Sequence, residues 1–424
     1  MMFVTILLLV LALLGVPLYA VIGTGAIIAY MQQGLPGEAL IIEILRLGEI
    51  PTLSAIPLFT LAGYLLSASN APKRMVALVH WGMGKIPGGL AMIGLVLSAL
   101  FTAFTGASGV TIVALGAVLY PALLASGFSQ KFSLGMVTTS GSLGLLFAPS
   151  IPLILYAVVA QQSGASNVGV DQLFKAGVVP GVLMLLVLMV YSYWVAKRHS
   201  KNSNDPASEI VFEKPGLRDL WEVPLPFVVL GGIYSGWMAL SEAAALTLAY
   251  VFIVEVLVLK EINRSKLIDT VKEASAMIGA ILIVFAVSLA STNYIIDAEV
   301  PEQLFDKISG LMSGQISFML LLVLFLLVLG MFLDIFSAIV IMIPILLPIA
   351  DGFGVHPVHL GIVFLATMQL GYMTPPVGMN LFISSNRFDM PVIDVYRATW
   401  PFVVLLLITV LIIALWPELS LFLL

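Results

Sequence analysis

The sequence predicts an all-α polytopic membrane protein, and three observations support this fold class. Of its 424 residues, 61% are hydrophobic and 10% carry a charge, whereas a soluble domain averages about 25% charged residues. The charges are bunched between apolar runs long enough to form membrane-spanning helices. Landmarks in the first half return in the second half at a nearly constant offset. This pattern excludes a soluble enzyme, a nucleic-acid-binding protein and a β-barrel, whose strands would alternate apolar and polar residues.

One long hydrophilic segment divides the chain near its midpoint. Residues 197–222 combine a high charge density with Pro, Gly and Ser, a composition typical of a linker. We therefore predict a first repeat over residues 1–196, a cytoplasmic linker over 197–222 and a second repeat over 223–424. The apolar N-terminus has no Lys or Arg before Arg46, so we interpret it as a retained membrane segment rather than a cleaved signal peptide.

The two halves are predicted to be copies of one unit. SASN at 67–70 matches ASTN at 290–293 with an offset of 223 residues, and APSIP at 148–152 matches TPPVG at 374–378 with an offset of 226. A single short match would be weak, but several landmarks at one offset indicate an internal duplication. Each copy begins with two short apolar segments or one bent helix, followed by a third apolar segment.

A long apolar stretch with a polar centre comes next in each half. Residues 89–125 and 316–350 are too long for one crossing at about 1.5 Å per residue, and half of each stretch is too short for a full crossing. We therefore predict two re-entrant helical hairpins. Two broken helices, interrupted by prolines, follow them over 132–161 and 360–385, and a plain crossing ends each half.

Five net crossings per repeat would invert the second repeat relative to the first and place both termini outside the cytoplasm. Loop charge supports this inverted-repeat topology, because the predicted cytoplasmic segments hold 15 of the 18 Lys and Arg residues. These segments are 70–88, 126–131, 196–222, 260–274 and 386–397.

Two helix breaks in the first repeat are candidate binding elements. Non-helical backbone inside a membrane survives only where protein, water or an ion satisfies its N–H and C=O groups. The breaks are FTAFTGASGVT at 101–111 and TTSGSLGLLFAPSIPLI at 138–154. Both also have a structural interpretation, as a small-residue packing contact and as a proline kink. Their candidate binding residues are Thr105, Gly106, Ser108, Gly109, Ser140, Ser142, Pro149 and Ser150.

The second repeat has matching breaks, LGMFLDIFSAIV at 329–340 and LGYMTPPVGMNLF at 370–382. Asp334 lies in an apolar run, where a carboxylate costs about 2.5–3.5 kcal/mol on insertion scales and therefore suggests a function. It could bind sodium, carry a proton or cap the hairpin tip. The candidate residues of these two breaks are Asp334, Thr374, Pro375, Pro376 and Asn380.

Four stretches carry a family resemblance: GASGVTIVALGAVLYPALLASGFS, SGSLGLLFAPSIPLILYA, GMFLDIFSAIVIMIPILLPIA and GYMTPPVGMNLFISS. They resemble the large membrane subunit of tripartite ATP-independent periplasmic (TRAP) transporters, over nearly the whole chain. The resemblance implies an elevator-type transporter that imports an organic-acid anion, of the sialic acid or C4-dicarboxylate class, with sodium. It places the chain among the lipids of the bacterial inner membrane, with both termini periplasmic.

The resemblance also implies partners and residue roles. The partners are a periplasmic substrate-binding (P) protein and a small four-helix membrane (Q) subunit, expected as a separate chain because 424 residues leave no room for it. The implied substrate-binding residues are Thr105, Ser108, Ser140, Ser142, Ser150, Thr374 and Asn380. The implied sodium ligands are Thr105, Gly106, Ser108, Gly109, Pro149, Gly330, Asp334, Thr374, Pro375, Pro376 and Gly378.

The four motifs contain no Lys or Arg, so helix N-termini and bound sodium would have to attract an anionic substrate. The alternatives are a stand-alone sodium–carboxylate symporter without a binding protein, an intramembrane enzyme using Asp334, and a channel. Two further carboxylates, Glu242 and Glu255, lie in apolar segments, where we favour a structural role such as pairing with a neighbour.

Overall fold

The computed structural model describes most of the chain, and every element in the described part is helical. The described residues are 7, 8, 10–12, 14–32, 34, 38–83, 88–165, 167–199, 216–310, 312 and 314–424. Seven of their helices are long and apolar enough to cross a membrane, or up to nine if each of two bent helix pairs is one span. The predicted all-α polytopic fold class is confirmed.

The elements before the linker run from α2 to α11. They are α2 (Leu18–Gln32), α3 (Glu38–Arg46), η1 (Leu47–Glu49), η2 (Pro51–Ser54), α4 (Ala55–Ala68), α5 (Ala71–Met83), α6 (Gly89–Thr105), α7 (Ser108–Ala114), α8 (Gly116–Ala125), α9 (Gln130–Ser140), η3 (Leu143–Leu146), α10 (Ile151–Gln162) and α11 (Val170–His199).

The elements of the second half run from η4 to α21. They are η4 (Leu217–Leu220), α12 (Pro224–Tyr234), α13 (Leu240–Val251), the π-helical η5 (Phe252–Val258), α14 (Arg264–Asp297), α15 (Val300–Ser309), α16 (Gln315–Phe332), α17 (Ile335–Gly352), α18 (Pro357–Gly371), α19 (Met379–Phe388), α20 (Val392–Leu415) and α21 (Glu418–Leu421).

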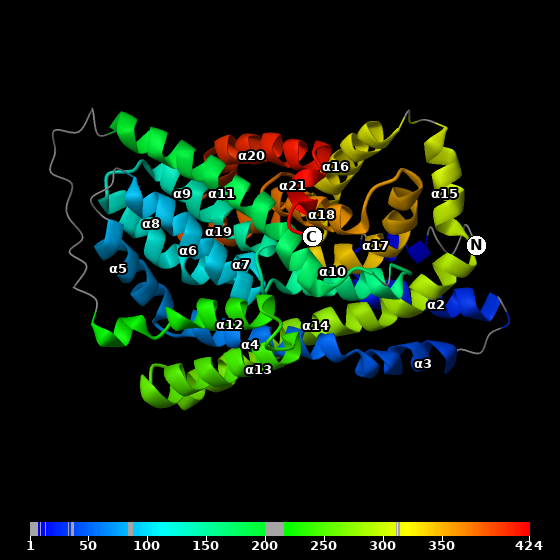
Figure 1. The fold of residues 1–424 in the computed structure, drawn as a ribbon, viewed down its shortest axis with the longest axis horizontal. Helices are drawn as coiled ribbons and strands as arrows, with labels where there is room; N and C mark the ends of the chain where they lie inside the picture. The colour runs from blue at the N-terminus through cyan, green and yellow to red at the C-terminus, as the bar shows by residue number, and fades with distance from the viewer. Residues whose placement is uncertain are drawn as a thin grey trace.

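The helices form a long layer and a larger body beside it (Figure 1). Helices α3, α4, α12, α13 and α14 run along one side of the molecule, and α6 to α11 with α16 to α21 fill the remainder. Helix α5 lies at one end of the molecule and α15 at the other end. Each of these two helices connects a helix of the layer to the first helix of a hairpin.

The first hairpin consists of α6 and the bent pair of α7 and α8. Helix α6 ends at Gly106, whose φ of +66° lies in the left-handed region that favours glycine. The Gly106 N–H donates to Thr102 O at 2.8 Å. The chain then folds back, so that a Cβ on Gly94 in α6 would lie 3.2 Å from Leu119 in α8. Helices α7 and α8 meet at a bend of 50°.

The second hairpin consists of α16 and α17, and aromatic rings close its open end. Phe318 near the start of α16 stacks on Phe353 just after α17, with ring centroids 4.7 Å apart. Phe305 of α15 meets the Phe353 ring edge-on at 5.2 Å. The two ends of the hairpin therefore lie together, and α15 packs against them.

Glycines let helices approach at backbone distance. A Cβ on Gly63 of α4 would lie 2.4 Å from Thr105 Cα at the end of α6. A Cβ on Gly371 of α18 would lie 2.6 Å from the Gly330 backbone in α16. No larger residue fits these contacts without a shift of the backbone, so Gly330 has a packing role whether or not it also binds an ion.

Two segments that the sequence predicts to be cytoplasmic, 70–88 and 260–274, are largely helical. Helix α5 fills most of 70–88, and α14 begins at Arg264 within 260–274. The Asn263 side chain caps α14 by accepting from the Lys266 N–H at 2.9 Å. The charged first turns of α14 continue the helix beyond its apolar run, so a change in polarity does not mark its end.

The broken helices are interrupted near their prolines, and the linker lies mostly outside the described residues. Helix α9 ends at Ser140 and α10 begins at Ile151, while α18 ends at Gly371 and α19 begins at Met379. Helix α11 extends into the first residues of the predicted linker, and residues 200–215 are outside the described part. The division into two inverted repeats stays a prediction.

Candidate functional site

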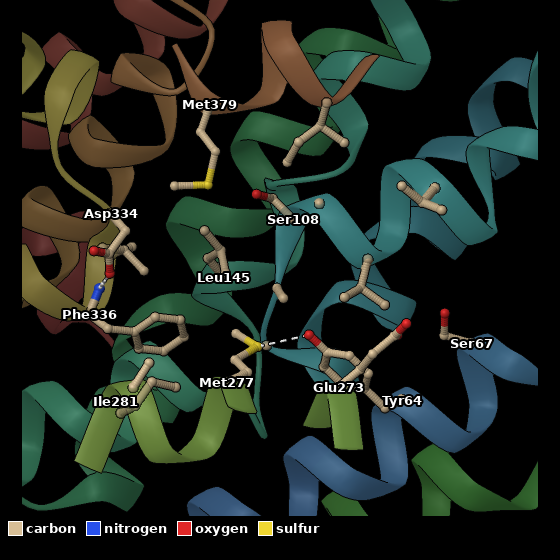
Figure 2. Close-up of a pocket in the computed structure, with 18 of the residues that line it drawn as sticks. Tyr64, Ser67, Ser108, Leu145, Glu273, Met277, Ile281, Asp334, Phe336 and Met379 are labelled. Atoms are coloured by element: carbon tan, nitrogen blue, oxygen red, sulfur yellow. Dashed lines mark hydrogen bonds between the residues drawn. The ribbon is translucent and has the colours of Figure 1, made fainter. Parts of the chain in front are cut away.

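A cavity of about 630 Å³ lies between the tips of both hairpins and the helices α4 and α14 (Figure 2). The first hairpin contributes residues 106–110, and the second contributes residues 334–337. In Figure 2, Asp334 lies on the opposite side of the cavity from Tyr64 and Ser67 of α4. Two segments more than 200 residues apart in the sequence thus form one wall of the same site.

Ser108 joins the first hairpin to the second broken helix. Its Oγ donates to Asn380 Oδ1 at 2.7 Å, which brings together two predicted substrate-binding residues from opposite halves. Asn380 is fully buried, and its Nδ2 has no hydrogen-bond partner among the described residues. Burial of an unpaired donor costs about 1–3 kcal/mol, so such groups are rare in folded proteins. Asn380 is not among the residues that line the cavity, but its partner Ser108 and its chain neighbour Met379 are.

Asp334 caps the N-terminus of α17 at the tip of the second hairpin. Its Oδ1 accepts from the N–H groups of Phe336 and Ser337, each at 3.0 Å, and its Oδ2 accepts from Ser337 Oγ. Of the three roles that the sequence leaves open, the geometry shows the cap. Asp334 also lines the cavity, so its negative charge acts on any molecule bound there. Its role as a sodium ligand stays a prediction.

Several predicted ligands of the first repeat are buried and do not belong to the described cavity lining. Ser140 and Ser142 each donate to a backbone carbonyl three residues earlier, and Ser150 Oγ donates to Leu145 O at 2.6 Å. These serines use their hydrogen in the bond and keep oxygen lone pairs that could accept. Thr105, Ser140, Ser142, Pro149 and Ser150 are buried and do not line the cavity, whereas Gly106, Ser108 and Gly109 line it.

The proline loop of the second broken helix is also separate from the described lining. Pro375 and Pro376 are exposed, and Thr374 Oγ1 donates to a carbonyl of α18 at 2.8 Å. Gly378 has a φ of +56°, and its N–H donates to Met331 O at 3.2 Å beside the second hairpin. This loop is therefore hydrogen-bonded to α16 of the second hairpin. The ligand roles predicted for its residues stay predictions.

The wall formed by α4 and α14 is not predicted by the sequence motifs. Tyr64 Oη donates to Met277 Sδ at 3.2 Å and links the two helices, and Glu273 of α14 lines the cavity (Figure 2). Ser67 lies in the repeated landmark SASN, which supported the internal duplication and did not indicate a binding role. Glu273 falls in segment 260–274, which the sequence predicts to be cytoplasmic.

The cavity lining is acidic. Asp334 and Glu273 are its charged residues, and the lining contains no Lys or Arg among the described residues. An anion bound here would therefore meet two carboxylates and no cationic side chain of this chain. A source of positive charge that does not come from these side chains is needed for anion binding.

Comparison with known proteins gives the family. Residues 5–419 match the model of the tripartite ATP-independent periplasmic transporter, DctM component. The chain is similar to the C4-dicarboxylate TRAP transporter large permease protein DctM of Pseudomonas aeruginosa, with 32% identity over 91% of this chain and 88% of the relative. It is also similar to the sialic acid TRAP transporter large permease protein SiaM of Vibrio cholerae, with 28% identity over 88% of this chain and 86% of the relative.

A solved structure shares the fold. The YdaH transporter of Alcanivorax borkumensis superposes with a TM-score of 0.67 over 89% of this chain and 87% of that chain, at 13% sequence identity. This likeness concerns the fold alone, whereas the family match extends over almost the entire sequence. The chain therefore belongs to the tripartite ATP-independent periplasmic transporter family as a DctM component, a multi-pass membrane transporter subunit and not an enzyme.

Proposed function

We propose that this chain is the large membrane subunit of a sodium-coupled importer of an organic-acid anion in the bacterial inner membrane. It receives a substrate of the sialic acid or C4-dicarboxylate class from a periplasmic binding protein, and it works with a small four-helix Q subunit on a separate chain. The observation that carries the proposal is the cavity between the two hairpin tips, because it is formed by both halves of the chain.

In the proposed transport cycle, the hairpins and broken helices move as one body along the layer of α4, α13 and α14. Such an elevator motion would carry a substrate held at the tips from one side of the membrane to the other. Helices α5 and α15 connect the two bodies at opposite ends, which suits them to accommodate this movement (Figure 1).

Sodium supplies the positive charge that the cavity lacks in this proposal. Asp334 already accepts hydrogen bonds from the first N–H groups of α17, so its carboxylate offsets the positive end of that helix. A sodium ion near the tips would offset the acidic lining and attract a substrate carboxylate. Ion and substrate then increase each other's affinity by the same factor. The proposed donor to the substrate is Asn380 Nδ2, which is buried behind the lining residue Ser108 and has no partner among the described residues.

Replacing sodium by potassium tests the coupling directly. In proteoliposomes containing this chain and its Q subunit, with the binding protein outside, we expect uptake of labelled substrate to fall by about 5-fold to 150-fold in potassium. Labelled sialic acid and a labelled C4-dicarboxylate are tested in parallel, each with its binding protein. Equal uptake in the two salts would show that sodium does not drive transport. Uptake that persists without a binding protein would favour the stand-alone symporter.

Asp334→Asn separates the cap from the proposed ion contact. Asparagine caps helices about as well as aspartate, so we expect the variant to fold with a similar melting temperature. Because a unit charge at about 4 Å is worth roughly 4 kcal/mol at an effective dielectric constant of 20, the apparent sodium affinity should fall about tenfold or more. The measurement is uptake against sodium concentration. Asp351→Asn, at the exposed far end of α17, serves as a control. An unchanged sodium dependence in Asp334→Asn would leave Asp334 with the cap alone.

A further inference from the structure

A second group of charged residues lies outside the cavity, where three parts of the chain meet. Arg74 of α5 binds the carboxylates of Glu222 at the end of the predicted linker, Glu255 in η5 and Glu261 before α14. The exposed fractions of Arg74, Glu222 and Glu255 are 7%, 6% and 1%. This cluster thus joins the first half, the linker and the second half in a largely buried place.

The charges of this cluster do not balance. One guanidinium faces three carboxylates, so the fully ionised cluster carries a surplus of negative charge, and buried charge is tolerated only when it is paired. Glu261 is the most exposed of the three. Burial acts to raise the pKa of Glu261, but the hydrogen bonds from Arg74 and from the Asn70 N–H at 2.7 Å outweigh it and lower this pKa. Glu261 is therefore the ionised partner of Arg74.

The other two carboxylates compete for one nitrogen atom. Arg74 Nη2 donates to Glu255 Oε1 and Oε2 at 2.8 and 3.0 Å, and it also donates to Glu222 Oε1. Carboxylates that share one nitrogen are neighbours, and two negative charges this close disfavour each other's ionisation. Glu222 Oε2 is buried and has no hydrogen-bond partner among the described residues. A proton on this oxygen would lower the negative charge of the pair and give the oxygen a hydrogen to donate.

We propose that the pair of carboxylates on Arg74 Nη2 binds one proton, which makes this cluster a proton-binding site between the linker and both halves of the chain. Among the described residues, the other charged or titratable groups that face them are Arg74, Glu261 and Tyr250 of α13, whose hydroxyl donates to the carbonyl of the residue before Glu222. The proton lowers the surplus charge and allows Arg74 to hold all three carboxylates. Two carboxylates sharing a proton titrate as a pair.

A proton bound to this pair of carboxylates determines how the stability of the folded protein changes with pH. A carboxyl group that is neutral in the folded protein and ionised when unfolded stabilises the fold less as pH rises from its ordinary range to the value at which the folded pair releases its proton. Above that value the ionised carboxylates of the cluster repel one another. The end of the linker with Glu222 is then held less firmly against α5 and η5. The folded protein should therefore lose stability on the alkaline side.

The test compares wild type with Glu222→Gln and Glu255→Gln, using the full chain purified with its Q subunit. Glutamine imitates the protonated carboxyl group, so we expect the wild-type melting temperature to fall from about pH 6 to about pH 9 and both variants to lose this fall. Infrared difference spectra at neutral pH should show the carbonyl band of a protonated carboxylic acid, sensitive to D2O, in wild type and in neither variant.

Glu242→Gln is the matched control, because Glu242 lies on the neighbouring helix α13, where it accepts from the Ala239 N–H at 2.8 Å. Glutamine can still make this capping contact, so the control should keep both the acid band and the wild-type pH dependence. If wild type lacks the acid band, or if both variants keep its pH dependence, the proposal is wrong. It is also wrong if sodium chloride, and not choline chloride, stabilises wild type in place of a proton.

Discussion

Replacing Asn380 by leucine should lower substrate uptake by about 100-fold while the protein still folds. The change removes the buried Nδ2 donor that lacks a partner and the oxygen that accepts from Ser108 Oγ at 2.7 Å. A hydrogen bond to a charged group is worth about 1.5–3 kcal/mol, and about 1 kcal/mol is added for the neutral bond that positions Ser108. A loss of about 3 kcal/mol corresponds to about 100-fold. Uptake in proteoliposomes measures the effect.

A neighbouring hydrogen bond provides the matched control for Asn380→Leu. Ser384 lies on the same helix α19 and accepts from Thr138 Oγ1 at 2.9 Å, and both residues are buried outside the cavity lining. Ser384→Ala therefore removes a buried contact between the two halves without changing the proposed site. We expect it to transport at close to the wild-type rate. Equal losses in the two variants would mean that packing of α19, and not recognition by Asn380, explains the result.

Gly144→Ala should prevent stable folding. A Cβ on Gly144 would lie 2.1 Å from Ala99 O and 2.6 Å from Ala103 N, both backbone atoms of α6. No rotamer change can relieve a clash with backbone, so the first hairpin must shift away from η3. Overpacking typically costs about 1–3 kcal/mol, and this overlap should reach or exceed the upper end of that range. The measurements are the yield of monodisperse protein after detergent extraction and its melting temperature.

Gly279→Ala is the control for the loss of glycine itself. Gly279 lies within α14, and no atom lies within 4 Å of the position of its Cβ. Alanine is favoured over glycine in a helix by about 1 kcal/mol, so this variant should be as stable as wild type or slightly more stable. A normal yield of Gly144→Ala would show that α6 and η3 can separate without loss of the fold.

Much of this fold can be predicted from the sequence, because membrane helices are recognisable as long apolar segments bounded by polar residues. The turn at Gly106 and the cap at Asp334 could be located in advance, since each interrupts an apolar run with a residue suited to that backbone. The far wall of the cavity could not be located. Tyr64 and Glu273 are ordinary residues of their own helices, and only packing between distant helices gives them a shared surface.

The buried cluster shows a second limit of sequence reasoning. Glu255 in an apolar segment suggests a paired carboxylate, but the identity of its partner depends on how α5 and η5 are placed side by side. Nothing in the local sequence around Arg74 indicates three carboxylate partners. Helix ends are limited in the same way, because α14 continues through charged turns that are solvated as readily in a helix as in a loop.

The contact between Gly63 and Thr105 has a mechanical consequence for the proposed cycle. Helices that pack through large side chains interlock, with ridges of one helix in grooves of the other, and such surfaces resist sliding. At Gly63 the surface of α4 has no side chain, and the backbone of the hairpin tip lies directly on it. In the proposed elevator motion, this contact without a side chain would let the tip slide along α4 with little resistance. Even the methyl group of an alanine at position 63 would collide with the hairpin tip at this contact and would hinder the proposed movement.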